Sequence, residues 1–204
     1  TVQDAVEKYE LSSNYDLRTK KFAGAFFTEH NQNVRISPDD SKIYTANNHS
    51  TIFSYDILAT NSSQNFYGRQ GALKLLQGEV YDPHSLAFNS TGTKLYVTGG
   101  VNVNNDYANE IRGYGVFEYD LSVAYDTSTA VYNSNFYEIP FGIDPFPITA
   151  MFFKPDGTKL YTAAKYDPSN IESHPSTVYI QSHTLSIPFD LTSITHTLIL
   201  SLIL

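Results

Sequence analysis

The feature that most constrains the fold is an octapeptide that occurs three times. Its copies are residues 37–44 (SPDDSKIY), 89–96 (NSTGTKLY) and 154–161 (KPDGTKLY). Each copy follows a short hydrophobic segment and leads into a second segment in which polar and hydrophobic residues alternate. Tight turns favour proline, Asp or Asn, and glycine, because these residues fix φ, bond the backbone or adopt a positive φ. The pattern therefore predicts three copies of one β-hairpin.

A second phrase, built around an aromatic-Asp pair, lies between these hairpins. It occurs at residues 9–19, 119–129 and 183–193, and a shorter copy begins at Tyr55-Asp56. We expect a turn in which the Asp accepts backbone N–H groups while the aromatic ring covers the sheet edge. We place this turn between the outer strand of one unit and the inner strand of the next.

The spacing of the repeats predicts the architecture. The hairpins recur at intervals longer than the roughly 40 to 50 residues that a four-stranded antiparallel propeller blade needs. We therefore predict an all-β fold, a β-propeller-like array in one domain over residues 1–204, with blades at about 17–57, 58–121 and 122–185. The extra length is assigned to inserted loops at 99–115 and 165–176, which should project from one face.

Two terminal segments remain outside these blades. Residues 6–11 are predicted to be a single strand that ends one blade, and the apolar residues 197–204 a single strand that begins another. An exposed apolar strand promotes aggregation, so we expect the second segment to be covered. The two strands could close a small ring, partner chains could cover them, or the sequence could be an excerpt of a longer propeller. We favour the last two.

Composition excludes several classes of function. With 21 acidic and 13 basic residues the formal charge is −8, which disfavours nucleic acid as a partner. A membrane-spanning helix needs about 20 apolar residues, and no segment is that long. Cysteine is absent, which excludes disulfides and thiolate metal sites. We expect no cofactor.

The repeated phrases also carry a family resemblance. KPDGTKLY, NSTGTKLYVTGG and YDLSVAYDTSTAVY resemble surface-layer or YVTN-type β-propeller repeats, such as those in arrays of uncharacterised bacterial and phage structural proteins. The resemblance implies a propeller fold and a structural role. In such repeats a Pro-His pair often precedes the inner strand, and Pro83-His84 is similar, whereas the other blades have Gln32 and Thr149 at this position.

Few residues suggest catalysis or metal binding. His84 could face a central channel near Asp82 and form a His-carboxylate pair, although we expect a structural histidine. Asn102, Asn104 and Asp106 carry oxygen ligands at alternating positions, as calcium loops do, but the glycine and the distal Glu of an EF-hand are missing. An ordinary loop is favoured, and no zinc site is predicted.

We therefore expect a non-catalytic module of an extracellular or virion-surface assembly, such as a tail fibre. It would act as a scaffold, or bind proteins or glycans through the inserted loops, and oligomerise through its terminal strands. Tyr107, Tyr114 and Tyr166 are the candidate anchors in these loops, together with His84. The alternative is a propeller lyase, hydrolase or dehydrogenase with a site at the channel mouth.

Three N-glycosylation sequons occur, at Asn48, Asn61 and Asn89. This number is near chance in a chain rich in Asn and Ser, so we expect no glycan.

Overall fold

The computed structural model describes residues 4–28, 33–38, 41–47, 51–57, 69–74, 80–102, 111–140, 147–166 and 177–203. Within these residues, the secondary structure consists of β-strands and short 3-10 helices. The strands are β1 (Asp4–Leu11), β2 (Lys20–Thr28), β3 (Asn33–Ile36), β4 (Lys42–Asn47), β5 (Thr51–Asp56), β6 (Arg69–Lys74), β7 (Tyr81–Phe88), β8 (Lys94–Asn102), β9 (Ile111–Leu121), β10 (Ala130–Glu138), β11 (Ile148–Phe153), β12 (Lys159–Tyr166), β13 (Thr177–Leu185) and β14 (Ile194–Ile203), and the 3-10 helices are η1 (Leu17–Thr19), η2 (Thr127–Thr129) and η3 (Leu191–Ser193).

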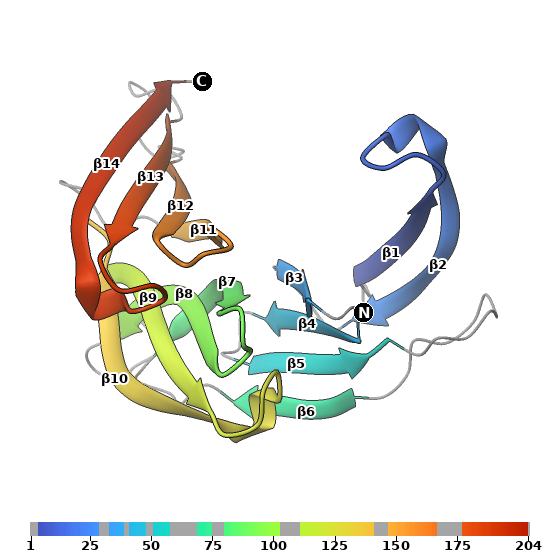
Figure 1. Ribbon diagram of the computed structural model, residues 1–204, viewed down its shortest axis with the longest axis horizontal. Coiled ribbons are helices and arrows are strands. Elements are labelled where there is room, and N and C mark those ends of the chain that lie inside the picture. The colour runs from blue at the N-terminus through green and yellow to red at the C-terminus, as the bar shows by residue number, and fades with distance from the viewer. Residues whose placement is uncertain are drawn as a thin grey trace.

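The strands form three antiparallel sheets of four strands each and one sheet of two. The first sheet is β3–β6, the second β7–β10 and the third β11–β14, while β1 pairs with β2. The sheets stand around a common centre as an open arc, with β3, β7 and β11 innermost and β6, β10 and β14 outermost (Figure 1). The predicted all-β, propeller-like array of four-stranded antiparallel blades is confirmed.

The sheet boundaries differ from the predicted blades 17–57, 58–121 and 122–185. Each sheet ends one strand later than predicted, because β10 pairs with β9 and β14 pairs with β13. The aromatic-Asp phrase thus joins the third and fourth strands of one sheet and does not cross to the next. Residues 6–11 lie in β1, which pairs with β2, and 197–203 lie in β14 as the last strand of the third sheet. Neither segment is the single strand that we predicted.

The three octapeptides form equivalent hairpins, as predicted. Gly92 and Gly157 adopt the left-handed conformation expected of a turn glycine, with φ of +71° and +73°. In each copy the N–H of the first residue donates to the carbonyl oxygen of the sixth. These donor and acceptor residues are Ser37 and Lys42 (2.9 Å), Asn89 and Lys94 (3.2 Å), and Lys154 and Lys159 (2.9 Å).

The aromatic-Asp turns also repeat one geometry. Tyr15, Tyr125 and Phe189 have φ of +62°, +60° and +61°, and the following Asp accepts the N–H of the residue two positions further on. In the second and third sheets the turn closes onto the hairpin glycine of the same sheet. The N–H of Tyr125 donates to the Gly92 oxygen at 2.9 Å, and that of Phe189 to the Gly157 oxygen at 3.0 Å. The Asp thus caps the turn, as predicted.

The core lies between the sheets. The alternation of β8 places Leu95 and Val97 in a cluster with the first sheet, and Tyr96 in a cluster with the third. Met151 and Leu160 of the third sheet are fully buried in the latter cluster. The second sheet is thus covered on both faces, as expected for stacked modules that cannot bury their apolar faces alone.

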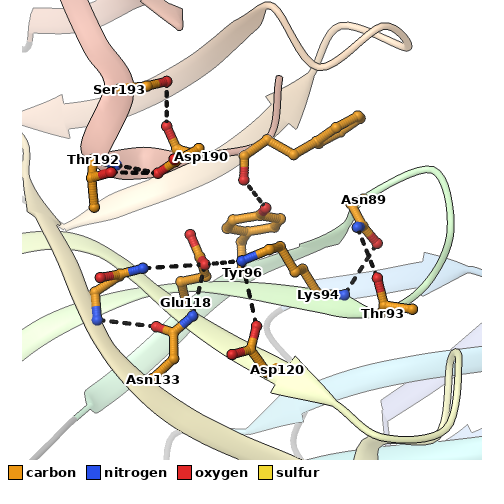
Figure 2. A network of polar contacts seen from close by, with 12 residues as sticks. Asn89, Thr93, Lys94, Tyr96, Glu118, Asp120, Asn133, Asp190, Thr192 and Ser193 are labelled. Carbon is orange, nitrogen blue, oxygen red and sulfur yellow. Dashed lines mark hydrogen bonds and ion pairs between the residues drawn. The ribbon is translucent and has the colours of Figure 1, made fainter. Parts of the chain in front are cut away.

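A tyrosine hydroxyl bridges each pair of neighbouring four-stranded sheets. Tyr44 donates to the carbonyl oxygen of Tyr125 at 2.7 Å, and Tyr96 donates in the same way to Phe189 (Figure 2). Burial, with a further contribution from the nearby Glu118 charge, raises the pKa of Tyr96. The hydroxyl therefore remains a donor at neutral pH.

Replacing Tyr96 with phenylalanine should lower the free energy of unfolding by about 1–2 kcal/mol, because the partly buried Phe189 carbonyl loses its donor. Urea denaturation followed by circular dichroism measures this. Tyr161 occupies the equivalent place in the third sheet but is exposed, so Tyr161→Phe should change stability by less than about 0.5 kcal/mol. Equal losses in the two variants would contradict the role of this bond.

Candidate binding site at the centre of the array

A pocket opens where the three innermost strands converge. It is built from equivalent positions, because each inner strand contributes its last two residues. These residues are Arg35 and Ile36 of β3, Ala87 and Phe88 of β7, and Phe152 and Phe153 of β11, and Pro38 completes the lining. The hairpin repeat therefore forms the pocket as well as the fold.

Arg35 holds the floor of this pocket together. Its Nε donates to the carbonyl oxygen of Leu86 at 2.7 Å, and its Nη2 donates to the carbonyl oxygen of Met151. One side chain of the first sheet thus binds the inner strands of the other two. Burial lowers the pKa of Arg35 from its ordinary value, but a guanidinium remains charged at neutral pH.

The rim of the pocket is apolar and accessible. Ile36 and Phe152 are 55% and 54% exposed, although both are large hydrophobic residues. Phe152 also stacks on Tyr161, with 6.5 Å between ring centroids. Exposed aromatic and aliphatic side chains beside a partly buried cation suit an apolar side chain of a binding partner, with peptide groups at the polar edge.

The structure also brings together His84 and Asp82, near the opposite end of β7. Nε2 of His84 lies 3.2 Å from Oδ2 of Asp82, and Asp82 has a positive φ of +49°. The pair is partly exposed. Among the described residues, no group of three or more His, Asp or Glu side chains could hold a metal ion.

The tyrosines that we predicted as anchors in the inserted loops do not all lie where we expected them. Tyr114 is not a surface anchor, since it is only 7% exposed and packs between the second and third sheets. Gly99 and Gly100 are strand residues here, opposite Gly115 and Tyr114, so β8 and β9 extend well into the segment that we assigned to a loop. Tyr166 ends β12.

Other predicted residues lie at or beyond the edge of the described structure. Asn102 ends β8, while Asn104, Asp106, Tyr107, Asn48 and Asn61 lie outside the described residues. Asn89 lies in the hairpin of the second sheet. Its Oδ1 accepts the N–H of Lys94 at 3.1 Å, and its Nδ2 donates to Thr93 Oγ1 at 3.1 Å. The use of these sequons stays a prediction.

The sequence analysis missed a buried carboxylate. Glu118 of β9 is inaccessible to solvent, and its Oε1 accepts from Lys94, Asn133 and Asn135 (Figure 2). Burial alone would lower the pKa of Lys94, but the bond to Glu118 and the charges of Glu118 and Asp120 raise it. Alternation along β8 had suggested that Lys94 simply faces solvent. The cluster links three strands of the second sheet, because Lys94 lies on β8, Glu118 on β9, and Asn133 and Asn135 on β10.

Comparison with known proteins supports no family assignment. No protein-family model matches the chain, and no curated protein matches it. The described part of the chain contains no helix that could cross a membrane.

Some solved structures share the arrangement of sheets. Sqt1 from Chaetomium thermophilum is 13% identical with a TM-score of 0.45, over 95% of this chain and 56% of Sqt1. Sqt1 bound to the N-terminus of the ribosomal protein L10 is 14% identical with a TM-score of 0.42, over 95% and 55%. The Cps50 (Swd1) β-propeller domain from Myceliophteria thermophila is 11% identical with a TM-score of 0.31, over 82% and 70%. The chain spans little more than half of Sqt1, and similarity at this level transfers no function.

Proposed function

We propose that the chain is a non-catalytic, protein-binding scaffold module. The observation that carries this proposal is the pocket at the centre of the array, whose rim exposes Ile36 and Phe152. Soluble domains rarely leave large apolar side chains gathered at a concave site unless a partner covers them. Arg35 makes the floor rigid, so a partner would meet a preformed surface.

We further propose that the module belongs to an extracellular or virion-surface assembly of the YVTN-repeat type. The support comes from the resemblance of the repeat phrases to surface-layer proteins. The loops that join β8 to β9 and β12 to β13 would add protein or glycan contacts. Both segments connect the second and third strands of a sheet, so they occupy equivalent places in the strand order.

The proposal is tested with a phage-displayed peptide library selected against the purified chain. Peptides that bind should be rich in apolar and aromatic residues, and Phe152→Ser should weaken their binding roughly tenfold or more, because Phe152 forms the rim. Val131→Ser is the matched control, since Val131 is exposed on β10, away from the pocket. Failure to select any binder, or equal affinity in the two variants, would contradict a peptide-binding pocket.

The His84–Asp82 pair favours the second candidate, a propeller enzyme with a site in the channel. A hydrolase or lyase activity that disappears in His84→Ala but persists in Phe152→Ser would support this alternative. The exposed apolar rim of the pocket supports binding directly, so binding remains our proposal.

A further inference from the structure

The two ends of the array present matching halves of one interface. Within the chain, the first sheet is covered by the second, and the second sheet is covered by the third. The third sheet has no following sheet among the described residues, and the β1–β2 ribbon has no preceding one (Figure 1). Both the third sheet and the β1–β2 ribbon nevertheless carry the apolar side chains that contact a neighbouring sheet elsewhere in the array.

The third sheet leaves open the face that the second sheet buries. Its Tyr161, Ile180 and Leu200 are 36%, 39% and 57% exposed, while Tyr96 and Val116 of the second sheet are completely buried. Strand pairing defines the equivalence, because Leu200 lies opposite Ile180 as Tyr137 lies opposite Val116. The equivalent positions are Tyr161 and Tyr96, Ile180 and Val116, and Leu200 and Tyr137.

The β1–β2 ribbon carries the complementary half. Tyr9 and Phe22 pair across its two strands as Tyr119 and Tyr132 pair across β9 and β10, with ring centroids 5.8 Å and 5.4 Å apart. Tyr119 is buried against the first sheet, whereas Tyr9 and Phe22 are exposed.

The turn of the ribbon shows the same contrast. Leu17, the first residue of η1, is 72% exposed. Its counterparts Thr127 of η2 and Leu191 of η3 are buried, and η2 lies against β6 as η3 lies against β10. Each of these two 3-10 helices thus lies against the last strand of the preceding sheet. By the same rule η1 would lie against β14, whose exposed residues include Leu198 and Leu200.

We propose that the β1–β2 ribbon of one copy packs on β13 and β14 of a second copy. In this arrangement η1 covers Leu200, and the Tyr161 hydroxyl donates to the carbonyl oxygen of the second copy's Tyr15. The contact continues the interfaces within the chain, where Tyr44 and Tyr96 donate to the residues equivalent to Tyr15. The aromatic and aliphatic side chains on both sides are those of a sheet-to-sheet core.

A second copy fits better than the same chain, because the two surfaces lie at opposite ends of the open arc (Figure 1). Every copy has both halves, so the contact is head to tail. Such heterologous contacts form a closed ring or an open filament. Neither Leu17 nor Leu200 lines the central pocket. A loss of self-association therefore leaves peptide binding intact, and a loss of peptide binding leaves self-association intact, so the two proposals can fail separately.

Two charged variants test the proposal. Leu17→Asp disables the ribbon and Leu200→Asp disables the open sheet face, and two like charges cannot pair where the altered surfaces meet. Both sites are exposed, so the fold should survive, as circular dichroism checks. In sedimentation equilibrium the wild-type chain should associate with rising concentration, and each variant alone should associate roughly tenfold or more weakly. A mixture of the two should form a one-to-one dimer, because the intact ribbon of Leu200→Asp meets the intact sheet face of Leu17→Asp.

Four results would overturn the proposal. They are a wild-type chain that stays monomeric, variants that associate as strongly as the wild type, a mixture that stays monomeric, and a mixture that forms species larger than a dimer. Val131→Lys is the matched control, because Val131 is exposed outside both surfaces, and this variant should associate as strongly as the wild type.

Discussion

Replacing Gly157 with alanine should lower the free energy of unfolding by about 2–4 kcal/mol. Gly157 has a φ of +73°, a conformation that disfavours any Cβ. A methyl group there would also lie closer than 3.0 Å to three carbon atoms of the Phe189 ring. The ring has little freedom to retreat, because it packs on Phe153 with 5.3 Å between ring centroids. Urea denaturation followed by circular dichroism gives the change.

The steric part of this loss is separable from the backbone part. In a Phe189→Leu background the ring is absent, so Gly157→Ala should cost about 1 kcal/mol less than it does in the wild type. The backbone cost remains in both backgrounds, since φ stays positive. Losses that are simply additive would show that the ring does not restrict this turn.

Acidification should destabilise the fold through His183 by up to roughly 3 kcal/mol. Burial lowers the pKa of His183 to about 4 from its ordinary 6.5. Between these two pKa values, His183 is protonated in the unfolded chain and neutral in the folded chain. The contribution is therefore fully present above about pH 6.5 and is progressively lost as the pH falls towards 4.

The geometry around His183 explains why it stays neutral. Its ring lies between Thr162 Oγ1, 3.1 Å from Nε2, and Thr197 Oγ1, 3.0 Å from Nδ1, and Tyr137 packs on its edge. None of these three groups is a carboxylate that would stabilise an imidazolium.

The test is the difference in stability between the wild type and His183→Gln at several pH values. This difference should change by about 1.4 kcal/mol per pH unit between pH 6 and 4.5, because carboxylates and other histidines cancel. The hydrogen bonds lost on substitution add a cost that does not depend on pH. A difference that stays constant with pH would contradict a buried neutral histidine.

The turns could be predicted from the sequence because their geometry is local. Gly157 needs a positive φ, and Asp126 bonds the N–H of a residue two positions away, so neither depends on distant segments. The partner of the strand after such a turn is not local. The chain reverses at Asp126 whether the following strand stays in the same sheet or begins the next one. Only the pairing of β10 with β9 decides to which sheet this strand belongs.

The central pocket was harder to predict for the same reason. Arg35 lies in a short alternating strand and looks like a solvent-facing residue, yet its partners Leu86 and Met151 are 51 and 116 residues away. Tyr114 was misplaced because Gly99 and Gly100 suggest a turn, while in the structure they lie within a hairpin arm. The approach of His84 to Asp82 was the one central feature within reach of the sequence.

The hydrogen bonds of Arg35 also affect how the protein unfolds. A linear array of repeats can lose its end modules one at a time, since each module touches only its neighbours. Here a single guanidinium of the first sheet binds both the second and the third, so releasing either sheet leaves a partly buried cation without one of its acceptors. We therefore expect the three sheets to unfold together, as one cooperative unit.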